Sequence, residues 1–216
     1  MTGNISNKVM VLLVLTLFVV AFNSYRLGKL DGAITVTGGV VAANAGSVVP
    51  TGIPSVYGKE LGISYDDISP NDPNRADSTI RRLAQYDMDI TLAGANLERY
   101  INILYYMNNG ISCEYCCGAR AVIFENGEPA CGCAHSYSMR GLAKYLITKH
   151  GNQYSDEQIL EEVAKWKTLY FPGQIQQKAA ILQQQGIETS YTNLASNKYR
   201  GIEQGQTAGS GMVGGC

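Results

Sequence analysis

The sequence predicts a mainly α-helical domain with one cysteine-bearing β-hairpin, preceded by a single N-terminal transmembrane helix. Three observations predict this fold class: a long apolar run near the N-terminus, five later segments with helical hydrophobic spacing, and a block of five cysteines around an Asn-Gly turn. The chain has 216 residues, so one domain with short appendages is expected. Lys and Arg (17) balance Asp and Glu (18), which excludes a polybasic nucleic-acid binder and a highly charged disordered chain.

Residues 1–31 are expected to form a signal anchor in a membrane. Residues 9–22 are an unbroken apolar run, which the flanking apolar residues extend towards the length of a short span, and no small-residue cleavage site follows it. A removed signal peptide is the alternative. Because only a short tail precedes the run, the rest of the protein is expected outside the cytoplasm. Residues 32–56 are rich in small residues and are expected to be a flexible spacer, with a β-hairpin around Gly38-Gly39 as the alternative.

Residues 57–190 are expected to form the folded domain. Helical spacing occurs in five segments of it, which are residues 77–86, 97–108, 136–149, 155–170 and 174–185. Ser155 and Gln158 have the spacing of a capping box at the start of the fourth segment. From Thr189 the pattern fades into polar and small residues, so residues 191–216 are expected to be a mobile tail.

The cysteine block contains the chemistry of this sequence. Its outline is C-x-x-C-C, a linking segment, and C-x-C-x-H, and the sixth cysteine is the last residue, Cys216. The link is strand-like over residues 121–124 and then turns at Asn126-Gly127, so a hairpin is expected to bring the two cysteine groups together. Two thiol-bearing turns that meet in this way can build a tetrahedral thiolate site. The predicted metal ligands are Cys113, Cys116, Cys117, Cys131, Cys133 and His135.

Thiolate and imidazole ligands select soft metal ions and exclude calcium and magnesium. The C-x-C spacing, with thiols beyond four, favours Cu⁺, and a hairpin between paired cysteines favours Zn²⁺. An iron–sulfur cluster is disfavoured by the expected location outside the cytoplasm. Met139 lies one helical turn after His135 and is expected in the core rather than as a ligand. Glu114, Glu125 and Glu128 are expected to be solvated.

Two other uses of the cysteines stay open at this point. Structural disulfides suit an extracellular domain, but five cysteines cannot all pair within the block. The other is an extracytoplasmic thiol–disulfide redox protein with Cys131 and Cys133 as its working pair. The sequence has no nucleophile elbow, phosphate loop, zinc-protease helix or dinucleotide motif, so an enzyme is not the leading expectation. The first hypothesis is therefore a membrane-anchored protein that binds a soft metal ion and no nucleic acid.

Residues 130–135, Ala-Cys-Gly-Cys-Ala-His, resemble the core of the PCYCGC-motif proteins. These are exported, membrane-anchored, cysteine-rich bacterial proteins to which metal binding is ascribed. The matching residues are Cys131-Gly132-Cys133 with His135 nearby, whereas Glu128-Pro129-Ala130 stands where the family has Pro-Cys-Tyr. The resemblance covers a small part of the chain. It implies export and metal binding, and it implies no particular activity.

Overall fold

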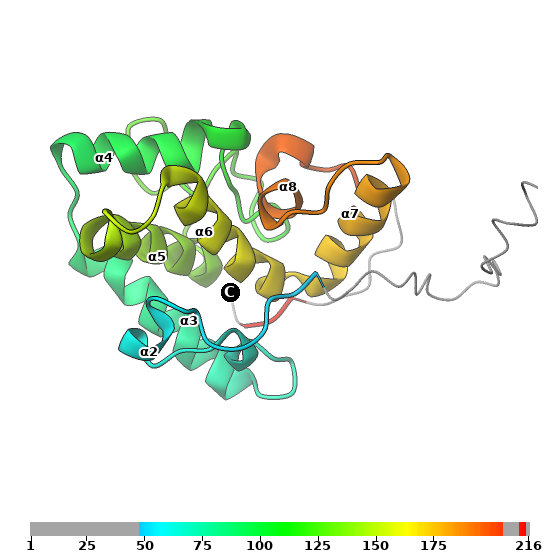
Figure 1. The fold of residues 1–216 in the computed structure, drawn as a ribbon, viewed down its shortest axis with the longest axis horizontal. Coiled ribbons are helices and arrows are strands. Elements are labelled where there is room, and N and C mark those ends of the chain that lie inside the picture. Colours follow the sequence, from blue (N-terminus) through cyan, green and yellow to red (C-terminus); the bar gives the residue numbers. More distant parts are fainter. Residues whose placement is uncertain (1–47, 205–211, 215–216) are drawn as a thin grey trace, which may run out of the picture. The chain divides into compact units, whose positions relative to one another are not determined.

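Seven α-helices and four shorter helical turns make up the part of the chain that the structure describes, residues 48–204 and 212–214 (Figure 1). In this computed structural model these residues belong to one unit, Ala45–Cys216. The helices are α2 (Gly58–Leu61), α3 (Pro73–Asp89), α4 (Gly94–Ile101), α5 (Ala134–His150), α6 (Asp156–Tyr170), α7 (Pro172–Gln184) and α8 (Tyr191–Ala195). The turns are Tyr65–Asp67, a π-helical turn Asn102–Tyr106, Met107–Asn109 and Asn197–Tyr199.

Helix α5 lies at the centre of this fold, because it packs against α3, α4 and α6 (Figure 1). Leu142 and Leu146 of α5 and Trp166 of α6 are fully buried. Gly141 lies where α5 approaches α3 most closely, and a Cβ at this position would be 2.0 Å from the backbone oxygen of Leu83. Any larger residue would push the two helices apart, so Gly141 permits the contact that forms the core.

Helices α3, α5, α6 and α8 begin at a residue whose side chain accepts a hydrogen bond from the first turn. The predicted capping box of α6 is present, because Ser155 Oγ accepts from the N–H of Gln158 (3.3 Å) and Gln158 Oε1 accepts from the N–H of Ser155 (2.8 Å). Helix α3 begins four residues before the segment that hydrophobic spacing predicts. Pro73 occupies its first turn, and Asp72 caps it by accepting from the N–H of Arg75 (3.1 Å).

The expected β-hairpin is not formed, and the described residues contain no β-strand. The turn at Asn126-Gly127 is present, but Ile123 and Pro129 make only an isolated antiparallel bridge. Proline has no N–H to donate to a strand ladder. The carbonyl of Val122 also accepts a hydrogen bond from the side chain of Arg140 (3.1 Å), which comes from α5. The N–H of Ala130 still donates to the same carbonyl (3.1 Å), so the two cysteine groups are joined by a tight turn, backbone hydrogen bonds and a side chain rather than by a sheet.

The prediction of a transmembrane helix also needs correction. Within residues 48–204 and 212–214, no helix combines the length and the apolar character that crossing a bilayer requires. The predicted signal anchor, residues 1–31, and most of the predicted spacer lie outside the described residues, as does Cys216.

Two segments that were expected to lie outside the domain contribute to its packing. Pro50 and Pro54, near the end of the predicted spacer, are buried. In the predicted tail, α8 packs against α6, Leu194 is fully buried and Val213 is 4% exposed. These segments are too short to show a hydrophobic period of their own, so only the folded domain reveals what they contact.

Candidate metal centre

One side-chain atom each from Cys113, Cys116, Cys133 and His135 gathers at the N-terminal end of α5. These four atoms all lie within 4.8 Å of one another, and the Sγ atoms of Cys113 and Cys133 are 3.3 Å apart. Sulfur ligands on a tetrahedral ion with ~2.3 Å bonds are separated by about 3.8 Å. The four side chains could therefore hold a metal ion after shifts of about 1 Å or less.

The other two cysteines predicted as ligands, Cys117 and Cys131, form a disulfide. The Sγ atom of Cys131 lies 3.6 Å from that of Cys133, so the disulfide borders the cluster. The structure thus brings all five cysteines of the block together, but two of them are not thiols. A cluster that could hold a metal ion therefore lies beside a disulfide, although the sequence offered these two uses of the cysteines as alternatives.

Cys133 occupies the N-cap position of α5, where its sulfur accepts from the N–H of Ser136 (3.4 Å). The hydrogen bond from the Cys113 thiol lowers the pKa of Cys133, with help from His135 and Ser136 and against the effect of burial. The same hydrogen bond, together with burial, raises the pKa of Cys113. The contact therefore favours the thiolate of Cys133, which is the form that binds metals, and the protonated form of Cys113.

His135 is fully buried beside this pair, and its ring packs against Tyr170 and Phe171. Its Nε2 atom lies 2.9 Å from the carbonyl oxygen of Val213. Because a carbonyl can only accept, Nε2 carries a proton in this contact, and Nδ1 is the ring nitrogen that remains for Cys133 or for a metal ion. Metal-binding histidines have the same arrangement, in which the second ring nitrogen donates to a carbonyl or carboxylate.

The four candidate ligands differ in their exposure to solvent. Cys113 is 1% exposed and His135 is 0% exposed, whereas Cys116 and Cys133 are partly exposed. Solvent therefore reaches the cluster past these last two cysteines. An incoming ion would meet the Cys133 thiolate before the buried ligands.

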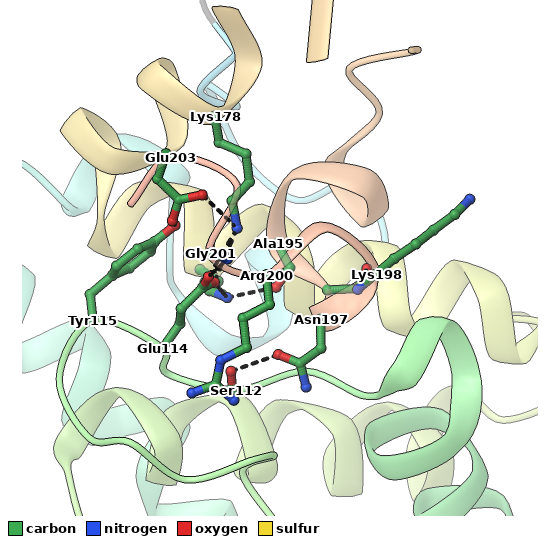
Figure 2. Close-up of polar contacts among 12 residues, drawn as sticks. Ser112, Glu114, Tyr115, Lys178, Ala195, Asn197, Lys198, Arg200, Gly201 and Glu203 are labelled. Carbon is green, nitrogen blue, oxygen red and sulfur yellow. Dashed lines mark hydrogen bonds and ion pairs between the residues drawn. The ribbon is translucent and has the colours of Figure 1, made fainter. Parts of the chain in front are cut away.

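Glu114, between the first two cysteines of the cluster, belongs to a buried group of charged residues (Figure 2). Its carboxylate accepts from Lys167 Nζ (2.9 Å), Lys178 Nζ (3.1 Å) and the N–H of Gly201 (2.9 Å). Burial raises the pKa of Glu114, but the two lysines outweigh this and lower it overall. The expectation that Glu114 is solvated is wrong, since its side chain is only 2% exposed.

This charged group also fixes the backbone of the first cysteine turn. Glu114 has φ +56°, a left-handed conformation that residues with a side chain rarely adopt. Its neighbour Tyr115 donates its hydroxyl to Glu203 (2.7 Å), which in turn lies 3.5 Å from Lys178 (Figure 2). Contacts to α6, α7 and residues 201–203 thus maintain the turn that presents Cys113 and Cys116 to the cluster.

Arg140 holds the second cysteine turn. Its buried guanidinium donates Nη1 to the carbonyl of Cys131 (2.8 Å), and its Nε pairs with Asp87 (2.7 Å). The sequence patterns did not identify Arg140, Lys167 or Lys178 as part of the site. The one available signal was that each of these charged residues falls among the apolar residues of an expected helix.

No known protein family, curated protein or solved structure matches this chain. The resemblance of residues 130–135 to the PCYCGC-motif proteins stays a prediction. Met139, the one thioether considered near the site, is fully buried in the hydrophobic core. The chemistry of the centre therefore follows from its own geometry, which offers three cysteines and one histidine around a single point.

Proposed function

We propose that this protein binds a soft metal ion, Zn²⁺ or Cu⁺, through Cys113, Cys116, Cys133 and His135. The observation that supports this is the gathering of their four ligand atoms within 4.8 Å of one another. Three cysteines with one histidine are an established ligand set for structural zinc, and thiolates favour Cu⁺ equally. The protein would fill all four positions of a tetrahedral ion, so the ion would join the cysteine turn to α5 rather than activate a water molecule.

The surroundings of the ligands support the proposal. Three of the four have a hydrogen-bonding or charged neighbour that orients them: Val213 for His135, Ser136 for Cys133, and the Glu114 group for the turn that contains Cys113. Such outer contacts typically change metal affinity by 10–100-fold when they are removed.

Metal analysis of the full-length protein tests the proposal. The protein is purified with the Cys117–Cys131 disulfide intact, loaded with Zn²⁺ or Cu⁺, and measured by inductively coupled plasma mass spectrometry. We expect one ion per chain, and we expect Co²⁺ to give a sulfur-to-metal charge-transfer band. Substoichiometric binding of both ions, or equal metal content in Cys133→Ser, would overturn the proposal.

The two histidines of the chain provide a matched control. His135→Gln removes the ring lone pair but keeps an amide N–H that can still donate to Val213. His150→Gln changes a residue that pairs instead with Glu60 (3.1 Å). We expect the first variant to weaken Zn²⁺ binding at least ~10-fold and the second to leave it unchanged.

A second candidate function, thiol–disulfide exchange, is favoured by the 3.6 Å separation between the sulfurs of Cys133 and Cys131. Attack by the Cys133 thiolate on Cys131 Sγ would form a Cys131–Cys133 bond and release Cys117 as a thiolate, with no net loss of electrons. The working pair expected from the sequence would then be the product of the exchange.

Disulfide mapping tests this second candidate. The metal-free full-length protein is held at neutral pH, quenched in acid, alkylated with N-ethylmaleimide and digested. We expect a fraction of chains with a Cys131–Cys133 disulfide and an alkylated Cys117, and we expect Zn²⁺ to suppress that fraction by occupying Cys133. A single Cys117–Cys131 disulfide at all times would remove this candidate.

A further inference from the structure

Residues 212–214 lie directly against the candidate metal centre, although Val213 is 78 residues from His135 in the sequence. Val213 is 4% exposed, and both of its backbone polar groups are used. Its N–H donates to the carbonyl of Tyr170 (2.9 Å), and its carbonyl accepts from Nε2 of His135 (2.9 Å). These three residues, which we name the C-terminal strap, therefore bridge the end of α6 and the start of α5.

We propose that the C-terminal strap is a positioning element of the metal centre, in which the Val213 carbonyl keeps the His135 proton on Nε2 and makes Nδ1 the metal-binding atom. This rests on the proposed function. A neutral imidazole has one proton and one ring lone pair, so a partner that accepts from Nε2 assigns the lone pair to Nδ1. Binding of a metal through Nε2 would require the strap to leave.

The structure around Gly214 favours glycine at this position of the C-terminal strap. This residue has φ +84°, and a Cβ built on it would lie 2.2 Å from Cδ1 of Ile80 and 3.6 Å from Nε2 of His135. Glycine therefore meets both the conformation and the space that the site provides. A β-branched residue would be strained at this φ and would also require the end of the Ile80 side chain to move, so it offers a way to displace the strap without changing any ligand.

Nitrogen NMR on the wild-type full-length protein tests the assignment directly. We expect Nε2 of His135 to be protonated in the metal-free protein. On addition of Zn²⁺ the Nδ1 signal should shift while Nε2 keeps its proton. Coordination of Zn²⁺ through Nε2, or a metal-free ring without a proton on Nε2, would overturn the proposal.

Gly214→Val tests the contribution of the strap, with Gly186→Val as its control. Gly186 also has a positive φ (+70°), but no atom lies within 4 Å of a Cβ built there. We expect Gly214→Val to weaken Zn²⁺ binding about 10–100-fold and to mix the two His135 tautomers, with helical circular dichroism preserved. Gly186→Val should change neither measurement. Unchanged affinity and tautomer in Gly214→Val would overturn the proposal.

The tautomer measurement separates this proposal from the proposed function. If wild-type protein binds neither Zn²⁺ nor Cu⁺, the metal-binding function fails, and an Nε2-protonated His135 would then show that the strap has only a structural contact. If the wild type binds metal through Nδ1, the function and the strap are both supported. If Gly214→Val does not fold, the wild-type NMR result decides alone.

Discussion

The Sγ atom of Cys113 lies 3.3 Å from the Sγ atom of Cys133, so the two side chains share a hydrogen bond. Their hydrogen bond raises the pKa of Cys113 and lowers that of Cys133. In an unfolded chain this contact is lost, and both thiols titrate near their ordinary pKa of about 8.5. The stability of the metal-free protein must therefore vary with pH.

The sign of this dependence follows from counting protons. Below about pH 8.5 the unfolded chain binds a proton on each thiol and the native pair binds one, so the free energy of unfolding rises with pH. Above about pH 8.5 the unfolded chain binds neither proton and the native pair still holds one, so the free energy of unfolding falls with pH. Cys133→Ser removes the thiolate. It should therefore abolish the rise of the unfolding free energy below about pH 8.5 and keep the fall above that pH.

Urea unfolding with a chelator, from about pH 5.5 to 10, measures this effect for wild type and Cys133→Ser. The difference between their free energies of unfolding should increase up to about pH 8.5 and then stay level. Subtraction cancels the other titrating groups that the two proteins share. A difference that is constant over the whole range would contradict a shared proton.

The Cys117–Cys131 disulfide joins residues 14 apart in the sequence. Closing a loop of this length removes conformational entropy from the unfolded chain and stabilises the native state by about 3 kcal/mol. The free energy of unfolding of the double variant Cys117→Ser, Cys131→Ser, measured in urea, should therefore be lower by about 3 kcal/mol. Its Zn²⁺ content should equal that of the wild type, because four ligands remain. Loss of the metal would instead show that one of these two cysteines is a ligand.

Arg140→Met should be strongly destabilising. The guanidinium is fully buried and pairs with Asp87, so its removal leaves a buried carboxylate with Lys144 as its one cationic partner. Breaking buried pairs of this kind costs about 3–5 kcal/mol of unfolding free energy. Arg81→Met, on an exposed face of α3, should cost less than about 0.5 kcal/mol. Equal effects in the two variants, measured by urea unfolding, would show that the Arg140 pair adds no stability.

Glu114→Gln should weaken both the fold and the centre. The neutral amide leaves two buried lysines without their shared carboxylate, so we expect a loss of about 3 kcal/mol in unfolding free energy. We also expect Zn²⁺ affinity to fall about 10-fold or more, because the turn between Cys113 and Cys116 loses its anchor. Glu125→Gln, an exposed carboxylate in the same block, should change neither quantity. Wild-type affinity in Glu114→Gln, with reduced stability, would restrict the charged group to a structural role.

Local patterns in the sequence were enough to predict where the principal helices lie. Ser155 and Gln158 start α6 through contacts between residues three apart, which need no information from the rest of the chain. The proximity of Cys133 and His135 follows in the same way, since they are two residues apart at the start of α5. These features are local, and that is why they are visible without a structure.

The distinction between Cys116 and Cys117 could not be predicted. The two residues are adjacent and chemically identical, yet one belongs to the candidate ligands and the other to the disulfide. What separates them is the direction of the turn before them, which Glu114 maintains through partners on α6 and α7. The predicted hairpin is reduced to an isolated bridge and a few backbone hydrogen bonds around its turn, and its bridge residue Pro129 has no N–H to extend a strand ladder.

The anchors of Glu114 come late in the chain, and this has a consequence for protein synthesis. Gly201 follows Glu114 by 87 residues, and Lys167 and Lys178 lie between them. At the usual elongation rate of ~5–20 residues per second, a ribosome needs about 4–17 s to make this stretch. During that interval the cysteines of the block have already been translated, while the contacts that arrange them do not yet exist. The nascent chain must therefore avoid oxidation or mispairing of its thiols until its last helices are made.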